Sequence, residues 1–122
     1  MAKIMVVDDS EHQRVQLKKD LEAGGHTVIE SKDALDGLEK LETHPDLNLI
    51  ICDVNMPGMD GITMCSKIHE GGKFPNLPIF MLTSEASAEI KKTAKQFGVR
   101  AWITKPHVTA KLLEAVEKVT QK

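Results

Sequence analysis

Short apolar runs alternate along the chain with longer segments in which apolar residues recur every three to four positions. The short runs are rich in β-branched residues, which is typical of buried strands; they cover about 3–7, 26–31, 47–52, 79–82 and 100–104. The longer segments have the period of amphipathic helices; they lie at about 10–24, 33–43, 62–68, 87–97 and 108–119. This alternation predicts an α/β fold in which five βα units form one doubly wound parallel sheet, as a single domain over 1–122.

The helical segments also indicate which side chains face the sheet. The expected inward residues are Val15, Leu17 and Leu21; Ala34, Leu35, Leu38 and Leu41; Ile62, Cys65 and Ile68; Ile90, Ala94 and Phe97; and Val108, Leu112, Ala115, Val116 and Val119. Ser10 followed by Gln13 has the spacing of a capping box, so we expect reciprocal hydrogen bonds between these two residues where the first helix begins.

Polar residues follow the first, third, fourth and fifth strands at the same end. They are Asp8-Asp9, Asp53, Thr83-Ser84 and Lys105-Pro106. Because the carboxyl ends of parallel strands open onto a common crevice, we expect these side chains to lie together. Two carboxylates about 4 Å apart near a protein surface repel by about 4 kcal/mol, so the cluster requires a compensating cation. Mg²⁺ suits one or two carboxylates plus a phosphate, a lysine binds phosphate as a point charge, and hydroxyls can donate to a phosphoryl oxygen.

Each of these polar residues also has an ordinary structural explanation. Asp8-Asp9 can be a solvated strand end or a helix cap, and Asp53 can begin the turn that follows it. Lys105 can be an exposed lysine, and Thr83-Ser84 can cap the next helix. Their joint placement at four strand ends favours a functional site over four separate accidents.

Composition narrows the class of protein. The chain has 122 residues, 41% hydrophobic and 28% charged, with a formal net charge of −2. It has only two arginines, and no run of basic residues reaches five, so nucleic-acid binding is not expected. No apolar stretch approaches the roughly 20 residues that span a bilayer, and no apolar leader precedes the first strand, so we expect a cytoplasmic protein that binds no membrane. Cys52 and Cys65 lack metal or redox spacing and are expected to be buried, reduced thiols.

Two further sets of polar residues have simple interpretations. The five histidines, none of them at metal-ligand spacing, are expected at the surface or at helix ends; they are His12, His26, His44, His69 and His107. Three lysines in the fourth helical segment are expected to form a solvated face or part of a docking surface; they are Lys91, Lys92 and Lys95.

Four motifs together resemble the response-regulator receiver domains, in particular the stand-alone chemotaxis type called CheY. They are V-V-D-D at 6–9, I-C-D-V-N-M-P-G-M-D-G at 51–61, M-L-T-S-E at 81–85 and I-T-K-P at 103–106. The resemblance covers essentially the whole chain. It implies a five-stranded parallel sheet in the order 2-1-3-4-5 with five helices.

The resemblance also assigns roles at the carboxyl end of the sheet. It implies that Asp53 is the phosphoacceptor, which takes a phosphoryl group from the phosphohistidine of a CheA-like histidine kinase. Asp8 and Asp9 would hold Mg²⁺, directly or through water, with the Asp53 carboxylate and the backbone carbonyl of Asn55.

The same resemblance implies a switch rather than an enzyme. Lys105 and the Thr83 hydroxyl would bind the phosphoryl oxygens, and the surface formed by the fourth helix, fifth strand and fifth helix would change its partners. A flagellar motor switch protein is the favoured output partner; a phosphatase is a possible further one, and the protein is expected to be a monomer. Trp102 departs from the family, which usually has Tyr or Phe at this switch position.

Three other functions share some of these sequence features. A phosphorelay intermediate or phosphate sink would use the same residues and would dock kinases or histidine phosphotransfer domains instead of a motor. A phosphatase of the haloacid dehalogenase type needs a second carboxylate two residues after the nucleophile, where this chain has Asn55. Flavodoxin-like cofactor binding is disfavoured because no hydroxyl-rich phosphate loop follows the first strand.

Overall fold

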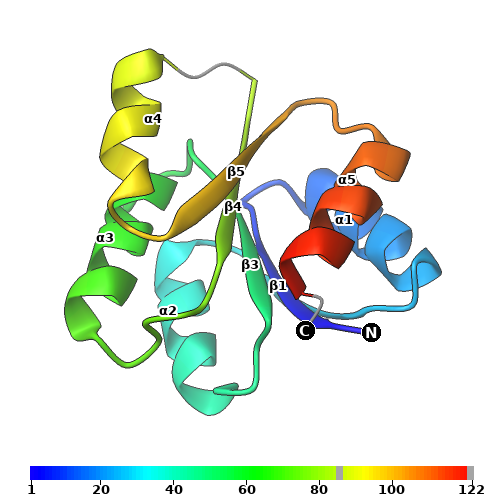
Figure 1. Cartoon of the computed structure of the whole chain (residues 1–122), viewed down its shortest axis with the longest axis horizontal. Coiled ribbons are helices and arrows are strands. Elements are labelled where there is room, and N and C mark those ends of the chain that lie inside the picture. The colour runs from blue at the N-terminus through cyan, green and yellow to red at the C-terminus, as the bar shows by residue number, and fades with distance from the viewer. Residues whose placement is uncertain (85–86, 121–122) are drawn as a thin grey trace.

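The computed structural model describes residues 1–84 and 87–120. Within them, five parallel strands form one sheet in the order β2-β1-β3-β4-β5, as predicted (Figure 1). The strands are β1 (Lys3–Val7), β2 (Thr27–Ser31), β3 (Leu49–Asp53), β4 (Ile79–Thr83) and β5 (Val99–Thr104). The third strand begins two residues later than predicted and includes Asp53, which pairs with Leu82 on β4. The candidate phosphoacceptor is therefore held by the sheet itself.

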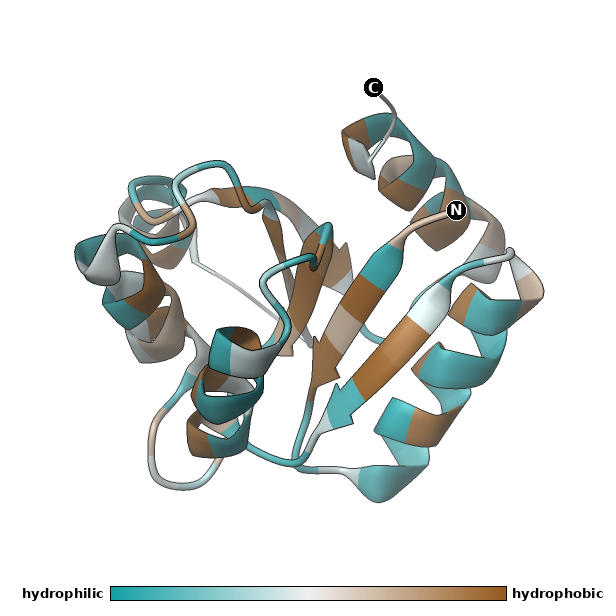
Figure 2. Ribbon diagram, turned by 90° about the horizontal axis from the view of Figure 1, so that it is seen from below, coloured by the Kyte–Doolittle hydropathy of each residue, from teal (hydrophilic) through white to brown (hydrophobic). Residues whose placement is uncertain are grey.

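Helices cover both faces of the sheet (Figure 1). They are α1 (Glu11–Ala23), α2 (Ala34–Thr43), α3 (Gly61–Gly71), α4 (Ala88–Lys95) and α5 (Thr109–Thr120). On one face, α1 and α5 pack Leu17, Leu21, Leu112 and Val116 against alternate strand residues. On the other, α2, α3 and α4 pack Ala34, Leu41, Met64, Cys65, Ile68 and Ala94. Figure 2 shows mostly apolar strands at the centre, surrounded by helices in which polar and apolar residues alternate.

Several residues expected to face the sheet are instead exposed, namely Val15, Leu35, Ile90 and Val108. Val15 is two positions from Leu17, so it projects from the opposite side of α1 to the buried Leu17 and Leu21. Val108 precedes the first residue of α5 and is not part of its apolar stripe. The stripes that contact the sheet are narrower than the apolar pattern predicts.

The start of α1 also differs from the expected capping box. The Ser10 hydroxyl accepts a hydrogen bond from the Gln13 N–H at 3.3 Å, as predicted. The Ser10 N–H, however, donates to Asp8 Oδ1 at 2.9 Å. The hydrogen bond expected between the Ser10 N–H and Gln13 is therefore replaced by one to Asp8, an acidic residue of the candidate site. This bond connects the start of α1 directly to that site.

His26 is the clear exception among the histidines, because it is buried where a surface position was expected. Its Nδ1 accepts a hydrogen bond from the Ala2 N–H at 3.0 Å, which joins the start of β2 to the start of β1. The carboxylate of Glu117 on α5 lies 3.6 Å from its Nε2. His26 thus takes part in packing between the two strands and α5.

Both cysteines are buried and unpaired, as predicted. Cys52 Sγ lies 3.8 Å from the sulfur of Met64, and Cys65 Sγ lies 3.6 Å from that of Met81. Burial raises the pKa of the Cys65 thiol to about 12 and that of Cys52 well above its usual value. Both thiols are therefore protonated at neutral pH.

Across the described ranges, no helix combines the length and the apolar character that crossing a membrane requires.

Candidate functional site

Three carboxylates meet at the carboxyl end of the sheet, as the sequence predicted. Val7 at the end of β1 pairs with Cys52 on β3, so Asp8 and Asp53 follow at neighbouring positions. One carboxylate oxygen from each of Asp8, Asp9 and Asp53 lies within 4.8 Å of the others. Asp8 is 1% exposed and Asp53 is 4% exposed, whereas Asp9 is open to solvent.

Asp8 carries a buried oxygen atom that is left without a hydrogen bond in the described part of the chain. Its Oδ1 accepts the Ser10 N–H, but among the residues that the structure describes its Oδ2 has no hydrogen-bond partner. Burial raises the pKa of the Asp8 carboxyl; the Ser10 N–H and Lys105 oppose this shift, and Asp53 and Asp9 add to it. An unpartnered anionic oxygen in this position is costly for the protein without a bound cation.

Lys105 supplies the positive charge that the sequence predicted for this crevice. Its Nζ lies 3.1 Å from Asp53 Oδ1 and 3.8 Å from Asp8 Oδ2. Its backbone N–H donates to the Thr83 carbonyl at 2.9 Å, and the following peptide bond to Pro106 is cis. The lysine is therefore anchored to the end of β4 while its ammonium contacts two of the carboxylates.

Thr83 is the last residue of β4 and is buried, directly after the residue that pairs with Asp53. It pairs with Thr104 on β5, next to Lys105. Ser84 follows and is exposed. Glu85, the last residue of the motif at 81–85, lies outside the described residues. The structure thus brings Thr83 to the same edge as Asp53 and Lys105.

The segment after Asp53 folds back against it. The Asn55 N–H donates to Asp53 Oδ1 at 3.4 Å, and the Gly61 N–H donates to the Val54 carbonyl at 2.9 Å. A Cβ atom on Gly61 would collide with the backbone carbonyl of Asp53. Glycine is therefore required where α3 begins, and the resulting loop places Asn55 beside the carboxylate cluster.

The donors at this edge fit a hard divalent cation. All three clustered side chains offer carboxylate oxygens, and the unpartnered Asp8 Oδ2 is available as a ligand. Mg²⁺ favours oxygen ligands and retains waters, which the exposed Asp9 side of the cluster allows. With Lys105 beside them, these groups have the composition of a site that binds a metal and a phosphoryl group together.

Comparison with known proteins agrees with this arrangement. Residues 4–117 match the family model of the response regulator receiver domain. The chain belongs to the response regulator receiver family. The chemotaxis protein CheY1 of Helicobacter pylori is 35% identical over 118 residues, which cover 96% of this chain and 95% of that protein.

Two further relatives add detail. The crystal structure of chemotaxis protein CheY4 of Vibrio cholerae superposes with a TM-score of 0.91 at 34% identity, and the match covers 98% of both chains. The sensor histidine kinase CheAY of Helicobacter pylori is 32% identical over 116 residues, which cover 94% of this chain but only 14% of that protein. The predicted fold and the predicted CheY-type receiver family are both confirmed.

Trp102 of this receiver domain is half-buried on β5. It pairs with Met81 on β4 and packs against the core on the side of α2, α3 and α4. It also borders a groove of about 330 Å³ between β5 and α5. Trp102 lies two residues before Thr104, which pairs with Thr83 on β4.

Sequence reasoning missed polar contacts that surround the site. Arg14 on α1 donates through Nη1 to the Asp8 carbonyl at 2.8 Å. Asp20, also on α1, contacts His107 at 2.6 Å and accepts from the Thr109 hydroxyl at 3.2 Å, which connects α1 to the chain beyond Lys105. In the sequence, Arg14 stands out only as one of two arginines, placed one helical turn after Ser10.

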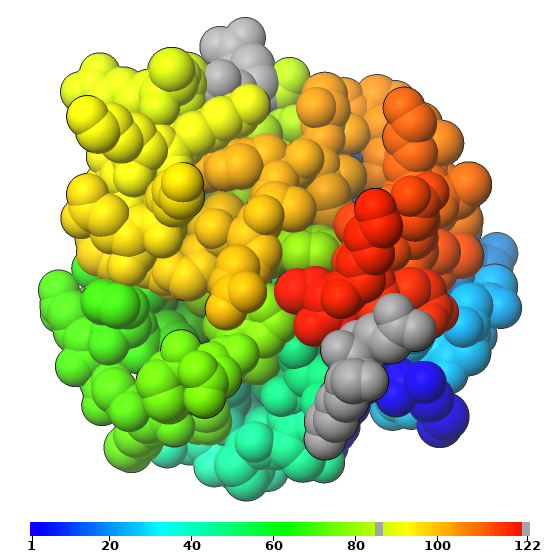
Figure 3. Space-filling model, viewed as in Figure 1, coloured from blue at the N-terminus to red at the C-terminus, as the bar shows by residue number. Residues whose placement is uncertain are grey.

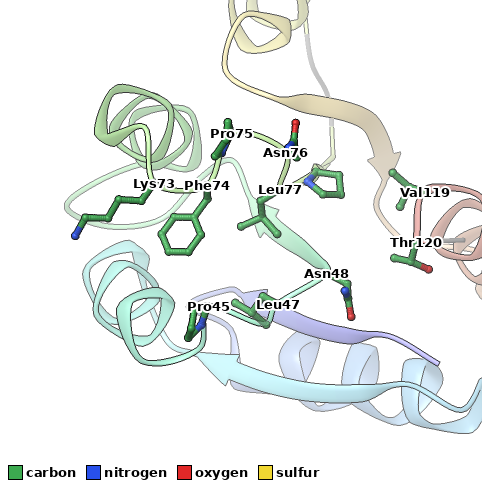
Figure 4. A pocket seen from close by; sticks show the side chains of 11 residues that line it. Pro45, Leu47, Asn48, Lys73, Phe74, Pro75, Asn76, Leu77, Val119 and Thr120 are labelled. Carbon is green, nitrogen blue, oxygen red and sulfur yellow. The ribbon is translucent and has the colours of Figure 1, made fainter. Parts of the chain in front are cut away.

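A separate hollow lies at the opposite, amino-terminal edge of the strands (Figure 4). It encloses about 370 Å³ and is lined by Pro45, Leu47, Asn48, Lys73, Phe74, Pro75, Asn76, Leu77, Pro78, Val119 and Thr120. Lys73 is the only ionisable side chain of this described lining, and it pairs with Glu42 at 3.2 Å. The hollow therefore lacks the clustered charges that distinguish the carboxyl edge.

Proposed function

We propose that this receiver domain is a phosphorylation-activated response regulator of a chemotaxis-type two-component system. Asp53 accepts a phosphoryl group from the phosphohistidine of a CheA-like histidine kinase. The modification changes the partners of the surface formed by α4, β5 and α5. The preferred output partner is a flagellar motor switch protein.

The contact between Lys105 and Asp53 is the observation that carries this proposal. An ammonium 3.1 Å from a buried carboxylate, with two further carboxylates in the same cluster, is an arrangement suited to phosphoryl transfer. Such transfer asks the protein mainly to position the reactants and to stabilise charge. The anchored Lys105 backbone and the placement of Asp53 in β3 provide that positioning.

The transfer itself uses the Asp53 carboxylate as nucleophile. One of its oxygens forms a bond to phosphorus while the bond between phosphorus and the kinase histidine nitrogen breaks, and the imidazole leaves with that electron pair. Asp8, Asp9, Asp53 and the Asn55 carbonyl would hold Mg²⁺, which when bound would offset the negative charge on the phosphoryl oxygens. Lys105 would then exchange its contact with Asp53 for one with a phosphoryl oxygen.

The output surface is continuous on one side of the molecule. Figure 3 shows α4 in yellow, β5 in orange and α5 in red side by side on this face. Lys91, Lys92 and Lys95 of α4 are all exposed. Trp102 would report or transmit the change, since it lies on β5, which belongs to this surface and pairs with β4 up to Thr83. Phosphorylation would favour one of two arrangements of these elements, and a partner would complete the shift.

A phosphate sink or phosphorelay intermediate is the second candidate. The specific support is the similarity of the whole chain to a segment of the sensor histidine kinase CheAY. In that role, the same surface would bind kinases or histidine phosphotransfer domains. A pulldown that compares phosphorylated and unphosphorylated protein against a flagellar switch protein and a phosphotransfer domain separates the two candidates.

The decisive test is covalent labelling with acetyl phosphate. Wild-type protein in Mg²⁺ should gain one phosphoryl group by intact-mass analysis, and Asp53→Asn should gain none while keeping its fold. Asp46→Asn is the matched control, because it removes an exposed carboxylate that pairs with Lys3 at 2.8 Å and should leave labelling unchanged. Stoichiometric labelling of Asp53→Asn would transfer the role to Asp8 or Asp9.

A further inference from the structure

Arg14 connects three parts of the chain beside the carboxylate cluster. From the first turn of α1, its Nη1 donates to the Asp8 carbonyl at 2.8 Å, and its Nε donates to Glu30 Oε1 on β2 at 3.3 Å. The Arg14 side chain is only 15% exposed. A guanidinium held at two points is more constrained than an exposed ion pair, and its planar fork fixes the direction of both hydrogen bonds.

The carbonyl that Arg14 contacts belongs to the peptide joining Asp8 to Asp9. Asp8 is already fixed, because its N–H donates to the Ser31 carbonyl at 3.1 Å and its Oδ1 accepts the Ser10 N–H. Asp9 differs: it is exposed, and no hydrogen bond or ion pair within the described part of the chain holds its carboxylate. The direction of the Asp9 side chain therefore depends on the orientation of this peptide.

Glu30 determines which way the Arg14 side chain points. Its Oε1 accepts from Arg14, and its Oε2 lies 3.7 Å from Lys18 Nζ. Without this carboxylate, a guanidinium that contacts the Asp8 carbonyl would be free to turn toward the acidic cluster, where it would compete with a metal ion. Glu30 keeps the guanidinium on the backbone carbonyl instead.

We propose that Arg14 is a positioning residue for the metal site: it holds the Asp8–Asp9 peptide so that the Asp9 carboxylate faces the cation. This rests on the proposed function, in which Asp8, Asp9 and Asp53 bind Mg²⁺. Hydrogen-bond partners outside the ligand shell typically contribute about 10-fold to 100-fold to metal affinity, because they orient the ligands.

The sign of the effect separates positioning from simple electrostatics. Removing a positive charge beside an acidic site should tighten Mg²⁺ binding if charge alone matters. Removing a positioning residue should weaken it. Lys18→Ala is the matched control, because Lys18 contacts the same Glu30 and carries the same charge but has no contact with Asp8.

The experiment measures Mg²⁺ affinity by isothermal titration calorimetry for wild type, Arg14→Ala, Arg14→Lys and Lys18→Ala. We expect Arg14→Ala to bind about 10-fold more weakly, and Lys18→Ala to bind as tightly as wild type or slightly more so. Arg14→Lys should lie between, since its single ammonium keeps the charge but lacks the planar fork. In EDTA, the NMR signal of the Asp9 amide should shift in Arg14→Ala and stay in place in Lys18→Ala.

The proposal is overturned if Arg14→Ala binds Mg²⁺ as tightly as wild type or more tightly, or if its Asp9 amide signal is unchanged. If wild type binds no Mg²⁺, the proposed function fails separately, and the Asp9 amide in EDTA still decides whether Arg14 orients the peptide. Circular dichroism checks the fold, and Arg14→Lys supplies the same two readouts if Arg14→Ala does not fold.

Discussion

The central strand β3 and the edge strand β5 are covered very differently. All five residues of β3 are buried, whereas only Val99 of the six residues in β5 is buried. The neighbouring helices follow the same trend: α3 buries Gly61, Met64, Cys65 and Ile68, but α4 buries Ala94 alone. The candidate phosphoacceptor Asp53 therefore stands in the tightly packed region, and the proposed output surface lies in the lightly covered one.

This difference suits a switch that must hold its chemistry in place while changing its surface. Regions with few buried apolar contacts rearrange or open at lower free energy than core strands. A rearrangement of α4 and β5 would leave β3 and its carboxylate largely undisturbed. Two isoleucines, one in each region, allow the comparison to be tested with the same substitution.

Ile50→Ala should have the largest effect. Ile50 is fully buried at the centre of β3, and removing its side chain leaves a cavity that typically costs about 2–5 kcal/mol of unfolding free energy. Urea denaturation followed by circular dichroism measures the loss. If the variant is too unstable to study, Ile50→Val should cost about 0.5–1.5 kcal/mol. If neither substitution lowers the unfolding free energy, β3 does not belong to a tightly packed region.

Asp8→Asn should stabilise the metal-free protein at neutral pH, because it removes a buried charge with an unpartnered oxygen. We expect a gain on the order of 1 kcal/mol, measured by urea denaturation in EDTA. Mg²⁺ should stabilise wild type and have little effect on this variant. A less stable variant would mean that Lys105 alone compensates the buried carboxylate.

The same substitution should remove part of the pH dependence of stability. Because the pKa of Asp8 is raised in the folded protein, the folded state binds this proton more tightly than the unfolded state does. Stability of the metal-free wild type should therefore fall as pH rises from the ordinary aspartate value through the raised one. A denaturation series across this range should be flatter for Asp8→Asn, and equal slopes for both proteins would contradict the assignment.

Ile90→Ala should have the smallest effect. Ile90 lies in the first turn of α4 and is 39% exposed, so truncating it removes little packing, and alanine favours the helix. We expect a change within about 0.5 kcal/mol under the same denaturation conditions. A loss approaching that of Ile50→Ala would show that α4 is packed as firmly as the core, and the contrast between the two regions would fail.

The order of the elements and the buried strands could be predicted from the sequence. The spacing of apolar residues and the polar residues that follow each strand are local features, which do not depend on contacts between distant parts of the chain. The exposure of Ile90 could not be predicted, since an apolar residue in a helix says nothing about how far the sheet extends beneath it. The exposure of Val15, by contrast, follows from its place two positions from Leu17 on α1. The burial of His26 had no local signal either, because its partner is the N–H of Ala2, 24 residues away.

At the candidate site, the sequence identified the side chains that meet but not the groups that orient them. Asp8, Asp53 and Lys105 stand out because charged residues directly follow apolar strands. Arg14 does not, since an arginine on a helix is ordinary until the fold places it against the Asp8 carbonyl. Every residue carries a backbone carbonyl, so the sequence does not show which carbonyl a side chain contacts. Supporting residues such as Arg14 can therefore be recognised only in the three-dimensional structure.

The two buried thiols can report how often the interior of this protein opens. Cys52 lies next to Asp53 on β3 and Cys65 lies on α3, and both thiols are buried and protonated. A thiol reagent reaches them only when strand and helix part, so the rate of modification counts how often the interior opens. Measuring the rate of that reaction with and without a partner docked on α4, β5 and α5 would show whether binding at the surface changes how often the region around Asp53 opens.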